Sequence, residues 1–197
     1  MEHERFEQIY KEGNPPWEHG TPDLNLERML ARFRIEPCRA LDLGCGMGNN
    51  AIWLARAGFR VHGFDLSETA VENAMVRVAA AGVSCDFQVG DFLTDQVDGA
   101  PFGLVFDRGC LHCVPEPVDR VRFADNVAEV LDEGGFWLSL MGNADEPERE
   151  VGPPRMTARQ IAEIVEPRFE ILVLEAGLFG GHQDDPPRAW ICLLKKR

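Results

Sequence analysis

One short stretch, residues 39–50 (RALDLGCGMGNN), constrains the fold more than any other part of this chain. A short apolar run ends near an acid, Asp42, and is followed by glycines at every second position and then by a helix-like segment. Gly44, Gly46 and Gly48 have no Cβ and can adopt positive φ angles. We therefore expect a strand that leads into a helix through a turn on which a ligand can lie directly against backbone.

The rest of the chain alternates short apolar runs with helical patterns, which implies a parallel sheet with helices on both faces. Strands are expected at 40–43, 60–64, 84–89, 103–106 and 136–141, and helices at 49–57, 67–82, 118–131 and 157–165. Gly134 and Gly135 read as a tight turn before the fifth strand, and 143–154 as a long loop. Two further alternating runs, 169–174 and 189–194, are expected to form a closing antiparallel pair.

Composition narrows the class of protein. A length of 197 residues suits one domain with a substantial core. The formal charge of −13 argues against nucleic acid as a partner, because a phosphate backbone needs clustered Lys and Arg and the basic run is confined to 195–197. No apolar run approaches the roughly 20 residues of a membrane helix, and no secretory signal is visible. The scattered cysteines read as reduced thiols, so we expect a cytoplasmic protein without a membrane partner.

Acidic residues lie at the ends of four successive strands of the expected sheet: Asp42, Asp65, Asp91 and Asp107. Ligands of open α/β sheets bind beyond the carboxyl ends of the strands. Any one of these residues is also explained by the preference of Asp for turns and helix caps. The set of four is explained better by a ligand site at this edge.

The spacing also bears on the chemistry of that ligand. Asp65 follows Gly46 by nineteen residues, which suits the two hydroxyls of a ribose and is shared with dinucleotide-binding folds. Here, however, Asn49 takes the place of the third glycine of G-x-G-x-x-G. Asp42 would repel a pyrophosphate and attract an ammonium group. These features favour S-adenosylmethionine over a dinucleotide such as NAD.

The glycine turn with its two flanking acids resembles motif I and its partner in class I S-adenosylmethionine-dependent methyltransferases. A narrower resemblance is to the thiopurine S-methyltransferase-like group, with its thiol, halide and tellurite-resistance relatives. It is carried by PPWE at 15–18, FDRGCLH at 106–112 and GPP at 152–154. The resemblance implies a doubly wound, mostly parallel seven-stranded α/β sheet of order 3-2-1-4-5-7-6, with the last strand antiparallel.

The same resemblance implies roles for individual residues. The methionyl part of the cofactor would lie on the glycine turn, the ribose at the acid ending the second strand, and the adenine beside the acid ending the third. Leu66 packs the adenosine in some relatives but cannot bond a hydroxyl. The candidate cofactor-binding residues are Trp17, Asp42, Gly44, Cys45, Gly46, Asn49, Asp65, Leu66, Asp91, Phe92, Asp107 and Arg108. Cys45 also has a plain explanation as a small packing residue.

Candidates for the chemistry itself are fewer. His112 follows the fourth strand and is the candidate general base, although a histidine bonded within a loop is as good an explanation. Arg155 could hold an anionic substrate or simply be solvated. The run 180–182 (GGH) could line an acceptor pocket. Cys110 and Cys113 lack a second cysteine pair at zinc spacing, so no metal site is expected.

We expect one domain over 1–197, with a helical cap or lid over 1–37 and a cofactor-binding core over 38–197. Trp17, in the cap, is expected to close over the cofactor. The expected activity is methyl transfer from S-adenosylmethionine to a small molecule, with a thiol or another soft nucleophile as the leading acceptor. Two alternatives stay open. One is an NAD(P)-dependent oxidoreductase, and the other is a methyltransferase-like protein that binds the cofactor without turnover.

Overall fold

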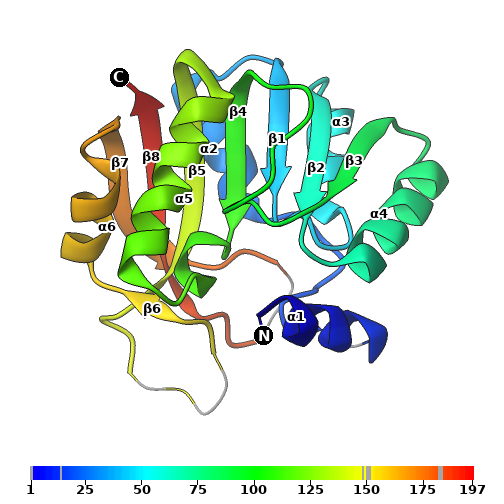
Figure 1. The fold of residues 1–197 in the computed structure, drawn as a ribbon, viewed down its shortest axis with the longest axis horizontal. Helices are drawn as coiled ribbons and strands as arrows, with labels where there is room; N and C mark the ends of the chain where they lie inside the picture. Colours follow the sequence, from blue (N-terminus) through cyan, green and yellow to red (C-terminus); the bar gives the residue numbers. More distant parts are fainter. Residues whose placement is uncertain (1, 14, 148, 150–151, 182–183) are drawn as a thin grey trace.

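A computed structural model describes residues 2–13, 15–147, 149, 152–181 and 184–197. Its centre is one sheet of order β3-β2-β1-β4-β5-β8-β7, with β6 paired to the end of β5 (Figure 1). The strands are β1 Arg39–Leu43, β2 Arg60–Asp65, β3 Cys85–Val89, β4 Phe102–Arg108, β5 Leu131–Asn143, β6 Arg155–Met156, β7 Phe169–Leu178 and β8 Arg188–Lys196. Only β8 runs antiparallel to its neighbours, β5 and β7. The α/β fold and the expected order of its seven main strands are confirmed.

Two details of the sheet differ from expectation. The fifth strand begins at Leu131, and its pairing with β4 shifts register between Phe102 and Leu104. Gly134, at φ 71°, and Gly135 therefore lie inside an irregular strand, and the prediction of a tight turn before the strand is wrong. The second difference is β6, a short strand directly after the predicted loop. A strand of two residues is too short to produce a recognisable sequence pattern.

The helices follow the expected pattern of caps. They are α1 Glu2–Lys11, α2 Leu24–Phe33, α3 Asn49–Arg56, α4 Glu68–Ala81, α5 Pro117–Val130 and α6 Ala158–Val165, with a 3₁₀ turn η1 at Leu111–Cys113. The Ser67 side chain caps α4 by accepting from Ala70 N, and Gly82 ends that helix in the left-handed conformation. Thr157 and Gln160 form the capping box of α6. Local hydrogen bonds thus set these helix ends.

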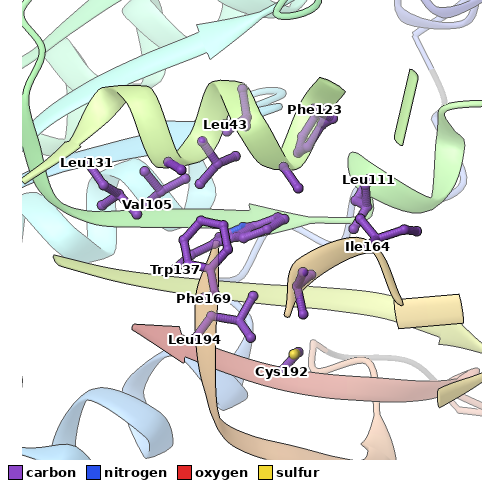
Figure 2. Packing of buried hydrophobic residues seen from close by; sticks show 14 of the residues in the cluster. Leu43, Val105, Leu111, Phe123, Leu131, Trp137, Ile164, Phe169, Cys192 and Leu194 are labelled. Atoms are coloured by element: carbon purple, nitrogen blue, oxygen red, sulfur yellow. The ribbon is translucent and has the colours of Figure 1, made fainter. Parts of the chain in front are cut away.

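Apolar side chains fill both faces of the sheet. On one face α5 and α6 pack on a cluster around the fully buried Trp137, with Phe123, Ile164 and Phe169 beside it (Figure 2). On the other face α2 and α3 pack on a second cluster. Leu26 and Met29 are fully buried there, so α2 belongs to the core of the sheet.

The segment before α2 lies elsewhere. Helix α1 lies at the same end of the sheet as β6 and the β7–β8 connection (Figure 1). It packs against α4, next to the carboxyl end of β2. Within the expected cap of 1–37, only the part that precedes α2 therefore lies over the end of the sheet where the glycine turn is found. None of the helices in the described ranges combines the length and the apolar character that a membrane span requires.

Candidate functional site

The glycine turn joins β1 to α3 and requires glycine at each of its three positions. The φ angles of Gly44, Gly46 and Gly48 are 70°, 52° and 83°. The backbone N–H of Gly44 donates to Phe64 O of β2 at 2.8 Å. A Cβ at Gly48 would lie 3.2 Å from the Cβ of Ala74, so this glycine also lets α3 and α4 approach each other.

Asp42 lies just before the turn and is almost fully buried. Its carboxylate accepts from the backbone of Ala51, while its Oδ2 atom has no hydrogen-bond partner in the structure. Burial, and next the charge of Asp65, raise the pKa of Asp42 to about 7. A buried acceptor without a partner is energetically unfavourable. The burial of Asp42 Oδ2 becomes favourable once a donor, such as an ammonium group, lies within hydrogen-bond distance of this atom.

Asp65 ends β2 and holds the turn in place. Its Oδ2 accepts from Gly46 N at 2.8 Å, and its Oδ1 accepts from Ser67 N at 2.9 Å. Each carboxylate oxygen has two lone pairs, so both can accept a further bond from a hydroxyl. The ribose role of Asp65 stays a prediction. Leu66 beside it is partly buried, as a residue packing against an adenosine would be.

An N-terminal cover, defined here as the described residues before Leu24, closes over the turn. A Cβ at Gly46 would lie 2.8 Å from the hydroxyl of Tyr10, a buried residue of α1. Trp17 Nε1 donates to that hydroxyl at 2.9 Å, and the Trp17 ring meets Phe6 edge to face at 5.7 Å. Trp17 therefore reaches the turn through Tyr10. The only sequence signal for Tyr10 is its position on an amphipathic helix, which does not place it in the site.

Two acidic residues anchor this cover to the core. Glu7 accepts from Ser67 Oγ and Thr69 Oγ1, both at 2.6 Å. Glu18 bonds Asn49 Nδ2 and lies 3.1 Å from the Arg77 guanidinium. The side chain of Asn49 thus faces the cover in this structure, and its role in cofactor binding stays a prediction.

Asp107, the acid at the end of β4, lies inside the fold. Asp107 is fully buried and accepts from Trp137 Nε1 at 2.9 Å and from Cys110 N at 3.0 Å. The Sγ atom of Cys110 occupies the place that a side chain at Gly44 would take. The thiol, and not the carboxylate, is thus what β4 presents to the glycine turn. Arg108, next in sequence, binds Asp23 of the cover at 2.8 Å.

His112 is buried, and its hydrogen bond decides where its proton lies. Its Nδ1 accepts from Gly142 N at 2.8 Å, so the neutral ring carries its proton on Nε2. Burial, with Arg108 and then Arg120, lowers the pKa of His112 to about 3. A ring in this state donates through Nε2 and is a poor proton acceptor, which counts against the general-base hypothesis.

The other candidates are spread more widely. Asp91 is exposed, and the ring of Phe92 packs in the core at 4.9 Å from that of Phe123. Cys45 is buried against Gly63, in agreement with a packing role. Arg155 is exposed and donates to the carbonyl of Glu146 at 2.8 Å. Of the run 180–182, His182 lies outside the described residues.

Two surface cavities, of about 310 and 300 Å³, lie away from the turn. One is lined by residues of α5 and the C-terminus, and the other by the end of α2 and the start of β5. Neither includes a candidate residue. Tyr10 and Cys110 lie against the turn itself.

Comparison with known proteins agrees with this geometry. Residues 40–135 match a family model described as a methyltransferase domain. The chain is 30% identical over 151 residues to probable thiol methyltransferase 2 of Arabidopsis thaliana, covering 76% of this chain and 65% of that protein. Residues 40–135 therefore carry a methyltransferase domain, and the comparisons support a class I S-adenosylmethionine-dependent methyltransferase. Its cofactor is accordingly S-adenosylmethionine.

Two further comparisons bear on this methyltransferase. Thiocyanate methyltransferase 1 of Brassica oleracea is 28% identical over 155 residues, with 78% of this chain and 67% of that protein covered. A solved structure from work on the conversion of a disulfide bond into a thioacetal during echinomycin biosynthesis has a TM-score of 0.84 at 23% identity. It covers 100% of this chain and 92% of its own, which shows the shared fold. The chain spans about two thirds of the length of the curated relatives it matches.

Proposed function

We propose that this methyltransferase transfers the methyl group of S-adenosylmethionine to a small thiol or to a comparably soft nucleophile. The observation that carries the proposal is the buried Oδ2 of Asp42, which has no partner and lies beside a turn of glycines with positive φ. An amino-acid ammonium supplies the donor and the charge that this atom lacks. Phosphate supplies neither.

The residues present fit the cofactor. When bound, S-adenosylmethionine supplies an electrophilic methyl group on a positively charged sulfur. Asp42 and the glycine turn would hold its methionyl part, and Asp65 would accept from the ribose hydroxyls. Trp17 and Tyr10 would exclude water above the turn, because they already form a closed aromatic lid there. Exclusion of water favours displacement by an anionic nucleophile.

The state of the two candidate proton acceptors at the end of β4 supports this acceptor class. Asp107 is fully buried and already accepts from Trp137 Nε1 and Cys110 N, and His112 uses its only lone-pair nitrogen for Gly142 N. A thiol needs little help from a base, because its pKa of about 8.5 leaves some thiolate at neutral pH. An alignment of nucleophile and methyl group then suffices. Relatives named as thiol and thiocyanate methyltransferases support this class.

Calorimetric titration with S-adenosylmethionine, S-adenosylhomocysteine and NADH tests the cofactor. We expect the first two to bind and NADH not to bind. Asp42→Asn should weaken binding, while Asp86→Asn, an exposed acid on β3, is the matched control. Preferential binding of NADH would favour the oxidoreductase alternative instead, for which the comparisons give no support.

A methylation screen followed by mass spectrometry tests the acceptor. Thiols and thiocyanate form one arm, and phenols, amines and N-hydroxy compounds form the other. We expect turnover in the sulfur arm at neutral pH. Turnover confined to phenols or amines would refute the acceptor class while leaving the cofactor intact. Tight cofactor binding with no turnover in either arm would leave a binding protein as the better explanation.

A further inference from the structure

We propose that Arg108 and Asp23 form a latch that joins the N-terminal cover to the β7–β8 connection, so that cofactor retention and the position of the acceptor-side loop depend on one contact. The proposal rests on the proposed function, because the cover closes the cofactor site. Both residues are positioning residues. Neither need touch a reacting atom for the latch to act.

Arg108 contacts two segments that are far from it in the chain, the N-terminal cover and the β7–β8 connection. Its Nε donates to Asp23 Oδ2 at 2.8 Å, its Nη2 to Gly180 O at 3.0 Å, and its Nη1 lies 3.4 Å from Trp17 O. Its guanidinium also lies over the ring of Phe179 at 5.1 Å. A planar group with five donors suits this task, and a lysine cannot reproduce it.

Asp23 completes the latch from the side of the cover. Its side chain is fully buried, and its Oδ2 also accepts from Gly180 N at 2.7 Å. Its Oδ1 accepts from the backbone of Asn25 and thereby caps α2, and its own N–H donates to Asn50 Oδ1 at 2.9 Å. Asn50 lies in the first turn of α3, directly after the glycine turn. Through its carboxylate and its backbone N–H, Asp23 therefore links the cover to the hairpin loop and to the start of α3.

The packing around the pair leaves little freedom. A Cβ at Gly180 would lie 2.5 Å from Asp23 Oδ1 and 2.6 Å from Leu24 N, so the loop fits only with glycine there. Phe179, under the guanidinium, lies 6.1 Å from the ring of His112. Opening the cover at Asp23 would break its bond to Arg108 and also its bond to Gly180 N, which holds this loop. Removing one partner of a buried charge pair leaves the other charge unpaired, which is strongly unfavourable.

The chain offers a matched control pair. Arg28 of α2 and Glu175 of β7 are 2.7 Å apart and also join the N-terminal region to the last hairpin, but at 47% and 33% exposed side chains. Exposed ion pairs contribute little. Arg28→Lys and Glu175→Gln therefore change a similar contact without removing a direct partner of Arg108 or Asp23.

The test compares Arg108→Lys and Asp23→Asn with these controls, after circular dichroism has shown that each variant is folded. Stopped-flow tryptophan fluorescence gives the dissociation rate of S-adenosylhomocysteine, and hydrogen exchange reports on residues 15–23 and 178–181. We expect either latch variant to release the ligand at least about tenfold faster, and both segments to lose protection together. The double variant should be no worse than the poorer single variant, because the two residues act as a unit.

Unchanged dissociation, or loss of protection in only one segment, would overturn the latch. Equal effects of the control substitutions would show that the latch variants act only by destabilising the fold in general. If the unmodified protein does not bind S-adenosylhomocysteine, the proposed function fails, while the exchange measurement still shows whether the two segments are joined. If Arg108→Lys does not fold, Asp23→Asn tests the same contact with an isosteric side chain.

Discussion

The carboxylate of Asp65 accepts a hydrogen bond from the backbone N–H of Gly46 at 2.8 Å, so the acid that ends β2 fixes the glycine turn that ends β1. The same carboxylate accepts from Ser67 N at the start of α4. The residue that should bind the ribose thus also shapes the surface on which the cofactor lies. Binding and local stability are coupled at this position.

Asp65→Ala should lower both the affinity for the cofactor and the stability of the fold. Loss of the carboxylate leaves two buried N–H groups without an acceptor, each a destabilisation of about 1–3 kcal/mol. We expect a lower unfolding temperature and at least about tenfold weaker binding of S-adenosylmethionine, the equivalent of roughly 1.4 kcal/mol. Calorimetry and thermal denaturation measure these effects. The control is Asp86→Ala on β3; an unchanged affinity in Asp65→Ala would show that the ribose site is wrongly assigned.

Binding of the cofactor should release a proton from Asp42. Its pKa of about 7 means that the carboxyl is about nine-tenths protonated at pH 6, whereas an ammonium partner requires the ionised form. Affinity should rise up to about tenfold per pH unit below pH 7 and then level off. Titrations at pH 6 in buffers of different ionisation enthalpy measure the released proton, which Asp42→Asn should abolish. No proton release in the unmodified protein would argue against an ammonium at this site.

The same residue should make the ligand-free protein less stable at high pH. Because the folded pKa lies above the ordinary value of 3.8, the folded state holds the proton more tightly, so this contribution is lost as the pH rises from about 4 to about 7. Asp42→Asn should therefore be more stable than the parent protein at pH 8 without cofactor. Denaturant unfolding at pH 4 and pH 8 compares the two, and an equal difference at both pH values would contradict the prediction.

Glu7→Gln should loosen α1 without unfolding the domain. Hydrogen bonds from Ser67 and then Thr69 lower the pKa of Glu7 to about 2. The stabilisation is complete above the ordinary value of 4.5 and is lost as the pH falls towards about 2. Hydrogen exchange at neutral pH should show faster exchange in α1 of the variant. Glu12→Gln, an exposed change directly after the same helix, should leave α1 protected.

His112 should act through its position and not as a base. With a pKa of about 3 it stays neutral at pH 5–9, so the pH profile of methyl transfer should contain no ionisation near the ordinary value of 6.5. His112→Asn can still accept from Gly142 N and should keep most of the rate, whereas His112→Ala should lose about 1–3 kcal/mol of stability. Steady-state rates and thermal denaturation distinguish the two. An equal loss of rate in both variants, together with a fall in the rate of the parent protein at acidic pH, would support His112 as the general base.

Much of the site could be predicted from sequence because its main signals are local. The glycine turn, the acid two residues before it and the Ser67 cap each depend on the conformations of a few neighbouring residues. Parallel strands place their carboxyl ends at one edge, so Asp42 and Asp65 could be expected together. The irregular start of β5 was not visible, since Gly134 and Gly135 suit a turn and a bulged strand equally well.

The sequence by itself determined the order of the elements, the class of fold and a turn open to a ligand, because hydrophobic period and glycine geometry act over short range. Only the tertiary structure decided what lies on that turn. Tyr10 lies 36 residues before Gly46, and Asp23 lies 85 residues before Arg108. The backbone N–H that Gly142 donates to His112 decides which ring nitrogen keeps its proton. Such pairings depend on how distant segments meet in the folded chain, which no local pattern encodes.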